Sequence, residues 1–231
     1  MPAVTHFSAS AAKTYLLCPR KWQYKYVLRL PDPPGAAAVR GTIVHEAVES
    51  YWRGEYHKPI AGIHRYIAAY RKMPGAARPE QVAHVELEVR ATLPGLDVPM
   101  LGYIDCLTAD GIIIDLKTAG RHWASTRALT ELQPALYTWL AESNGYTVTG
   151  FEFHILIGDG ADREINTQRF TLDLSDEEIE RHLAEVRQAW QGIVAGEFPT
   201  KRQVLCAWCN FQERCESQFE AGESIDESES P

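Results

Sequence analysis

The hydrophobic positions of this 231-residue chain change period along its length. Apolar residues three or four apart mark one face of a helix, whereas short alternating or β-branched runs mark strands. The order is helices, three strands, a helix, two strands, a helix and a cysteine-rich end. This order predicts an α/β fold with a mixed β-sheet flanked by helices. The predicted helices cover about 8–29, 42–56, 60–72, 131–143 and 175–196, and the strands 84–91, 99–107, 112–117, 149–157 and 166–173.

Helix boundaries are marked by local chemistry. Ser8 or Ser10 can cap the first helix, because a serine oxygen accepts from an otherwise unpaired first-turn amide. Pro19 is expected to break or kink that helix just after Cys18. The sequence from Ser175 to Glu178 has the form of a capping box and predicts the start of the last long helix.

The turn between the second and third predicted strands determines which side chains meet. A two-residue turn at 110–111 would place Asp105 opposite Leu116, so that the two aspartates would lie on opposite faces. A three-residue loop at 109–111, with its glycine in the left-handed conformation, instead places Asp105 opposite Asp115. We prefer the three-residue loop.

Under this register two carboxylates and an ammonium group share one face of the hairpin. Directly opposed residues have Cβ atoms about 4.5–5.5 Å apart, so the carboxylates would repel unless a hard cation such as Mg²⁺ or Mn²⁺ lay between them. The alternative is a solvated face with an Asp115–Lys117 salt bridge, but the run 112–114 indicates a buried strand. One face carries Asp105, Leu107, Ile113, Asp115 and Lys117, and the other Cys106, Ile112, Ile114 and Leu116.

The net charge of −8 neither supports nor excludes a nucleic-acid substrate. The segment 216–231 holds six acidic residues and no Lys or Arg, so the rest of the chain carries only −2. A Ser/Glu-rich end of this kind is expected to be disordered, which leaves 1–215 as a single domain. No apolar run of about 18 residues and no signal peptide is found, which predicts a soluble cytoplasmic protein without a membrane segment.

Four of the five cysteines are arranged as metal ligands. Cys206, Cys209 and Cys215 form a Cys-x2-Cys-x5-Cys motif, and Cys18 stands almost two hundred residues earlier. In a reducing compartment such cysteines are expected to be ligands rather than disulfides. Together they predict a metal centre that joins the two ends, holding zinc or a [4Fe–4S] cluster. Cys106 is predicted to be a buried small apolar residue.

The chain resembles the RecB-like branch of the PD-(D/E)xK nucleases with an iron–sulfur cluster, which includes the AddB nuclease domain and CRISPR-associated RecB-like exonucleases. The resemblance spans Ser8 to about Cys215 and implies a restriction-endonuclease-like core. It rests on five motifs in order: Tyr15-Leu-Leu-Cys-Pro-Arg-Lys-Trp22, Gly41-Thr-Ile-Val-His45, Gly102-Tyr-Ile-Asp105 with Asp115-Leu-Lys117, Gln133-x3-Tyr137, and the three C-terminal cysteines.

The resemblance also implies roles for individual residues. Asp105, Asp115 and His45 are metal ligands, and Lys117 is the catalytic lysine. Gln133 and Tyr137, one helical turn apart, lie beside the metal and substrate. Either Glu86 or Glu88 adds a further carboxylate, and the sequence does not choose between them. The resemblance favours a structural [4Fe–4S] cluster on Cys18, Cys206, Cys209 and Cys215.

The sequence is therefore interpreted as that of a Mg²⁺- or Mn²⁺-dependent deoxyribonuclease. Expected substrates are single-stranded DNA or DNA ends, cleaved by exonuclease action in recombination, repair or CRISPR adaptation. A helicase or a CRISPR-adaptation protein is the expected partner. The alternatives are a DNA-clamping scaffold subunit and a zinc-stabilised RNA-processing nuclease. The complete set of Asp105, Asp115, Lys117 and His45 argues against a pure scaffold.

Overall fold

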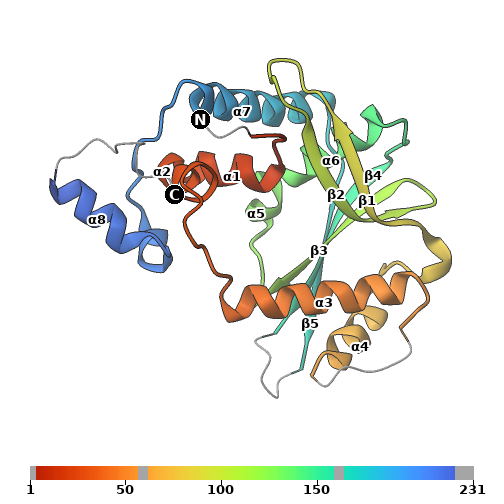
Figure 1. Cartoon of the computed structure of the whole chain (residues 1–231). Helices are drawn as coiled ribbons and strands as arrows, with labels where there is room; N and C mark the ends of the chain where they lie inside the picture. The colour runs from red at the N-terminus through yellow and green to blue at the C-terminus, as the bar shows by residue number, and fades with distance from the viewer. Residues whose placement is uncertain (1–3, 57–61, 159–163, 222–231) are drawn as a thin grey trace.

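The computed structural model of the protein describes residues 4–56, 62–158 and 164–221. These residues contain a five-stranded mixed sheet with helices on both faces, which confirms the predicted α/β fold (Figure 1). The strand order follows the chain, β1-β2-β3-β4-β5; β3 and β4 are parallel, and the other neighbouring pairs in this order are antiparallel. The strands are β1 (Val82–Ala91), β2 (Met100–Thr108), β3 (Ile112–Ala119), β4 (Gly150–Ile157) and β5 (Asn166–Leu172).

The helices fall into groups on either side of the sheet (Figure 1). Helices α1, α6 and α7 pack on one face, and α3 and α4 pack on the other. The helices are α1 (Ala9–Leu17), α2 (Pro19–Trp22), α3 (Ala36–Trp52), α4 (His64–Lys72), α5 (Ser125–Thr130), α6 (Gln133–Ser143), α7 (Asp176–Val194) and α8 (Gln212–Ala221). Shorter turns are the π-helix η1 (Gln23–Val27) and the 3₁₀ helices η2 (Pro79–Gln81) and η3 (Val204–Trp208).

Helix termini confirm the capping predictions. The Ser8 side chain accepts a 3.2 Å hydrogen bond from the amide of Ala11, and α1 ends immediately before the Cys18–Pro19 step. At the start of α7, Ser175 and Glu178 satisfy each other's backbone amides, at 3.3 and 2.9 Å. These contacts lie within a few residues, which explains why the sequence alone reveals them.

Other boundaries differ from the prediction. Helix α3 begins at Ala36 rather than Thr42, because Gly35 caps a run of alanines that are strong helix formers. Helices α5 and α8 were not predicted; α5 has six residues and no side-chain cap, so its local signal is weak. The third predicted helix was expected to start at Ile60, which lies outside the described residues. The segment 216–231, predicted to be a disordered tail, begins inside α8. Its residues 222–231 also lie outside the described residues.

The β2–β3 turn has the predicted register. Cys106 pairs with Ile114, and Leu107 pairs with Ile113, which places Asp105 across from Asp115. Gly111 has φ +91°, and a Cβ atom there would lie 2.7 Å from the carbonyl oxygen of Thr147. Only glycine fits this position, so the three-residue loop is confirmed.

The predicted division of side chains between the two faces of the hairpin is also confirmed. Leu107 and Ile113 belong to the core beneath α1, α6 and α7. Cys106 is fully buried in the core beneath α3 and α4, as predicted for a small apolar residue. Ile114 and Leu116 share that second core. Asp115 therefore faces the side of the sheet that carries α6, where Gln133 contacts it, whereas Asp105 lies near His45 of α3.

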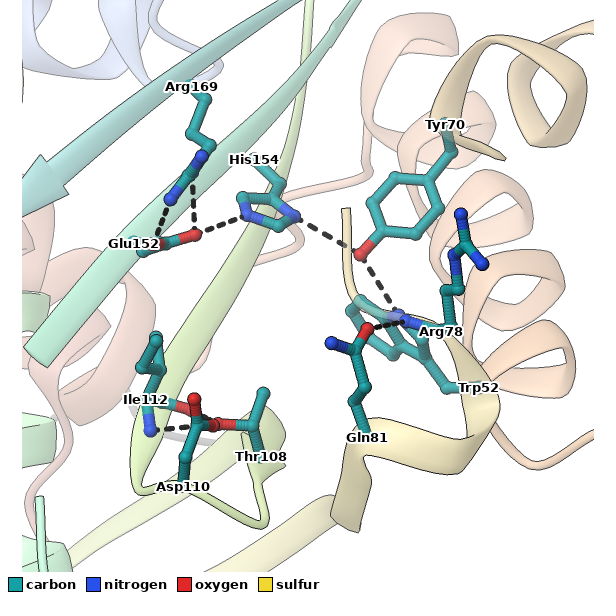
Figure 2. A network of polar contacts seen from close by, with 10 residues as sticks. All are labelled: Trp52, Tyr70, Arg78, Gln81, Thr108, Asp110, Ile112, Glu152, His154 and Arg169. Carbon is teal, nitrogen blue, oxygen red and sulfur yellow. Dashed lines mark hydrogen bonds and ion pairs between the residues drawn. The ribbon is translucent and has the colours of Figure 1, made fainter. Parts of the chain in front are cut away.

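A buried polar network ties α3 and α4 to the sheet (Figure 2). Trp52 Nε1 donates to the hydroxyl of Tyr70 at 3.0 Å, and that hydroxyl lies 3.1 Å from His154 Nδ1. His154 Nε2 lies 2.8 Å from Glu152, which in turn accepts two hydrogen bonds from Arg169. A carboxylate can only accept, so His154 carries its proton on Nε2, and Tyr70 donates to Nδ1.

Candidate active site

Asp105 and Asp115 lie where β2 and β3 separate. Pairing between the strands is present near the turn, at Cys106 and Leu107. Beyond it, Asp105 Oδ2 accepts a 2.7 Å hydrogen bond from the backbone amide of Leu116. The carboxylate thus takes the place of a carbonyl of the ladder at the point where the pairing ends.

Lys117, Gln133 and Tyr137 surround the carboxylate of Asp115. Lys117 Nζ lies 2.6 Å from Asp115 Oδ2 and donates to Gln133 Oε1 at 2.9 Å. Gln133 Nε2 donates to Asp115 Oδ1 at 2.9 Å and lies 3.4 Å from the hydroxyl of Tyr137. Gln133 therefore bridges β3 and α6. Because its oxygen accepts from Lys117 and its nitrogen donates to Asp115, the orientation of the amide is determined.

His45 approaches the aspartates from α3. Its Nδ1 lies 3.7 Å from Asp105 Oδ2. Burial, followed by the charge of Lys117, lowers the pKa of His45 to about 4. The ring is therefore neutral near pH 7 and keeps a nitrogen lone pair available. All six residues predicted for this site, from β2, β3, α3 and α6, are brought together.

Burial dominates the electrostatics of the two aspartates. Asp115 is 1% exposed. Burial and the charge of Asp115 raise the pKa of Asp105 well above its ordinary value. Burial also raises the pKa of Asp115, although Lys117 acts in the opposite direction. Two buried carboxylates of this kind need more positive charge than Lys117 alone supplies.

The structure distinguishes Glu86 from Glu88. Glu86 stands opposite Asp105 in the β1–β2 register and has φ +53°, which breaks the alternation of β1. Burial and the nearby Glu49 raise the pKa of Glu86. Glu88 is 54% exposed and accepts a hydrogen bond from Tyr103. Glu86 is thus the carboxylate near the aspartates; its partner Glu49 was not predicted, although it lies one helical turn after His45.

The four candidate ligand cysteines surround one pocket at the far end of α1. Cys18 joins α1 and α2, Cys206 lies in η3, Cys209 follows it, and Cys215 lies in α8. All four line a cavity of about 200 Å³. Burial and the neighbouring Cys18 raise the pKa of Cys215. The predicted ligands from both ends of the chain therefore converge on one place.

Protein contacts also join the two ends around this pocket. Lys201 Nζ donates to the carbonyl of Leu16 at 2.9 Å, and Gln203 donates to Leu17 at 3.0 Å. Asn210 donates to Asp32 at 2.6 Å. The C-terminal segment is thus docked on α1 and the loop after η1 by hydrogen bonds that need no metal.

A family model described as the PD-(D/E)XK nuclease superfamily matches residues 6–64 and 61–216. The chain belongs to this superfamily. The match covers the sheet, the aspartates and all four pocket cysteines. No curated protein sequence matches the chain.

Two solved structures support the fold of this PD-(D/E)XK nuclease, and a third aligns more weakly. A candidate exonuclease from Eubacterium rectale superposes with a TM-score of 0.63 at 13% identity, covering 96% of this chain and 90% of the other. SSO0001 gives a TM-score of 0.57 at 16% identity over 93% and 88%. LHK-Exo, solved with dAMP, gives 0.43 at 12% identity over 94% and 95%. No helix in the described ranges is long and apolar enough to cross a membrane.

The donor set of this nuclease fits a hard divalent cation, the cofactor typical of the superfamily. Asp115 Oδ2 is buried and accepts no hydrogen bond of good geometry, although Lys117 Nζ is close. Carboxylate oxygens and a neutral histidine nitrogen are suitable ligands for Mg²⁺ or Mn²⁺. Among the described residues, no three His, Cys, Asp or Glu side chains are grouped closely enough to hold a metal ion. Within the described ranges, neither the aspartates with His45 nor the four cysteines form such a group.

Proposed function

We propose that this nuclease is a Mg²⁺- or Mn²⁺-dependent deoxyribonuclease that hydrolyses phosphodiester bonds. The observation that carries the proposal is the placement of Asp105 opposite Asp115 at the separation of two strands, with Lys117 beside them. Opposed buried carboxylates with a raised pKa are stable as anions only next to a cation. Membership of a nuclease superfamily supports phosphodiester hydrolysis as the class of reaction.

Each residue of the site has a distinct task in this proposal. Asp105, Asp115 and His45 would hold the divalent cation, which would supply acidification of a water and neutralisation of charge on the phosphate. Lys117 positions the attacking water or a phosphate oxygen. Gln133 holds the side chains of Lys117 and Asp115 in position, and Tyr137 restrains the side chain of Gln133. The substrate is cleaved beside Asp105 and Asp115.

For the cysteine pocket we propose a structural [4Fe–4S] cluster held by Cys18, Cys206, Cys209 and Cys215. Support comes from the convergence of these thiols on one pocket from sequence positions almost two hundred residues apart. Soft thiolates suit iron–sulfur clusters or zinc, and a remote single cysteine is unlike the paired motifs of zinc ribbons. The cluster would constrain a long loop of the unfolded chain and so stabilise the fold.

The proposal extends to biological context through the RecB-like resemblance. The protein acts as an exonuclease on single-stranded DNA or DNA ends, in recombination, repair or CRISPR adaptation. It is cytoplasmic and works with a helicase or an adaptation protein. Residues 1–215 form the single nuclease domain, and the acidic segment that follows takes no part in the chemistry.

The deciding experiment compares cleavage of linear and circular DNA by protein purified without oxygen. With Mn²⁺ we expect release of nucleotides from end-labelled linear single strands, while circular single strands stay intact. Asp115→Asn and Lys117→Ala should abolish cleavage with an unchanged melting temperature. Asp173→Asn and Lys72→Ala, which alter exposed charges away from the site, serve as matched controls.

Three results would overturn this proposal. Cleavage that persists in both Asp115→Asn and Lys117→Ala would move the active site elsewhere. Wild-type protein that binds DNA tightly yet cleaves none of the substrates with Mn²⁺ or Mg²⁺ would favour the DNA-clamping scaffold. Cleavage of RNA but not DNA would favour the RNA-processing alternative.

A further inference from the structure

Two exposed cations are held on one buried carboxylate beside the candidate active site. Glu131, between α5 and α6, is 7% exposed. Lys13 of α1 forms an ion pair with its Oε2, and Arg127 Nε lies 3.6 Å from its Oε1. The side chains of Lys13 and Arg127 are 53% and 54% exposed. The cluster therefore presents two cationic groups to solvent with a net charge of +1.

Aromatic contacts connect Arg127 to the strand pair that carries Asp115. Its guanidinium lies 3.9 Å from the ring centre of Trp123, a close cation–π contact. Trp123 contacts Phe153 of β4 at 5.4 Å between ring centres. Phe153 is the strand partner of Asp115 and lies beneath Lys117 Nζ at 5.9 Å. A continuous set of packed side chains thus runs from Arg127 to the site.

Lys13 reaches the same place from the other side of Glu131. Glu131 precedes Gln133 by two residues, and Gln133 contacts both Asp115 and Lys117. Lys13 is therefore linked to Asp115 and Lys117 through the segment that carries Glu131 and Gln133.

Fold stability alone gives a weak reason for this arrangement. Half-exposed ion pairs contribute about 0–1 kcal/mol each, whereas burying the Glu131 carboxylate carries a desolvation cost. The geometry does restrict the two flexible side chains, which lowers the entropy lost when they bind an anion. Arginine has five donors, so Arg127 can contact Glu131 and a phosphate together.

We propose that Lys13 and Arg127 bind a backbone phosphate of the DNA strand adjacent to the scissile phosphate, with Glu131 as the residue that positions them. This inference rests on the proposed deoxyribonuclease function. Phosphate contacts fix the register of a strand without reading its sequence. Lys13 and Arg127 would thus determine which phosphodiester lies beside Asp105 and Asp115.

The test measures binding and cleavage separately. Binding of a fluorescently labelled single-stranded oligonucleotide is followed by anisotropy in EDTA, which prevents hydrolysis, between about 50 and about 200 mM salt. Lys13→Met and Arg127→Met should each weaken binding roughly tenfold and reduce the slope of log affinity against log salt by about 1. With Mn²⁺, KM should rise far more than kcat falls.

Controls separate phosphate binding from folding and from the proposed function. Arg181→Ala on α7, an equally exposed arginine paired with a glutamate, should leave affinity and slope unchanged. Lys13→Arg should restore binding. Loss of Lys13 alone leaves the buried carboxylate of Glu131 with one cation fewer. The double variant Lys13→Met/Glu131→Gln removes both partners of this ion pair. This double variant should fold normally and still bind the oligonucleotide weakly.

The outcomes are distinguishable. Active wild-type protein with unchanged affinity and salt slope in Lys13→Met and Arg127→Met overturns this inference and leaves the nuclease proposal standing. Loss of affinity with an equal loss in Arg181→Ala also overturns it, because any cation would then serve. Wild-type protein that cleaves no DNA would refute the proposed function on which the inference rests.

Discussion

Gln133 Nε2 donates a 2.9 Å hydrogen bond to Oδ1 of Asp115, across the gap between α6 and β3. The same amide accepts from Lys117 through its oxygen. Gln133 therefore holds an anion and a cation at a fixed distance. This relationship explains how a lysine 2.6 Å from a buried carboxylate is kept in place.

Replacing Gln133 should reduce activity without unfolding the protein. In Gln133→Ala, Asp115 loses a donor and Lys117 loses an acceptor, so both become less well positioned. We expect kcat to fall roughly 10- to 100-fold, as is usual for residues that orient metal ligands. Gln188→Ala on the exposed side of α7 is the control. Equal steady-state kinetics for the two variants would contradict the assigned role.

The β2–β3 turn should tolerate no side chain at Gly111. Its φ of +91° and the 2.7 Å approach of the Thr147 carbonyl both oppose a Cβ atom. We expect Gly111→Val to lower the free energy of unfolding by about 1–3 kcal/mol. Gly120→Ala, where nothing lies within 4 Å of the added Cβ, should change it by less than about 0.5 kcal/mol. Denaturant titration measures both.

Acid should destabilise the protein through its buried neutral histidine. Burial lowers the pKa of His154, so the unfolded chain binds a proton that the folded protein excludes. Stability is complete above the unfolded pKa of 6.5 and is lost progressively as pH falls below it. The pKa of Glu152, lowered to about 2 by its hydrogen bonds to His154 and Arg169 against the effect of burial, adds a second loss below 4.5.

Denaturation at several pH values tests this assignment. His154→Gln should reduce the dependence of unfolding free energy on pH between 6.5 and 5 by at most about 1.4 kcal/mol per pH unit. His45, whose pKa is lowered to about 4, contributes a similar dependence that remains in this variant. An unchanged slope in His154→Gln would mean that His154 is protonated in the folded state.

The two proposed metal sites should respond differently to chelation. EDTA should remove a divalent cation from His45, Asp105 and Asp115 and abolish activity, and Mn²⁺ should restore it. The cysteine centre should survive brief EDTA treatment, because its ligands are tightly bound thiolates. Activity that EDTA leaves unchanged would contradict a divalent cation at the aspartates.

Cysteine replacement tests the second centre. Cys18→Ala or Cys209→Ala should give colourless and poorly soluble protein, since the free energy of binding the cluster is also free energy of folding. Cys106→Ala, in the apolar core beneath α3, should stay brown. Iron and sulfide analysis after purification without oxygen provides the measurement. Zinc without iron would refute the [4Fe–4S] assignment.

The sequence by itself determined the features that depend on neighbouring residues. The caps at Ser8 and Ser175, the break at Pro19 and the loop at Gly111 follow from hydrogen bonds and backbone conformations within a few positions. The hairpin register follows in turn, because the turn fixes the pairing and side chains alternate. Asp105 could therefore be placed opposite Asp115 from the sequence alone.

Only the tertiary structure decided which distant groups meet. Glu86 has a positive φ and a raised pKa, whereas Glu88 is exposed, and no pattern in the sequence distinguishes the two. Lys13 and Glu131 pair across 118 positions of sequence. Such contacts are set by how α1, α5 and α6 pack together, and no local pattern encodes them. A side-chain cluster built from several elements becomes visible only when the cores that orient those elements are formed.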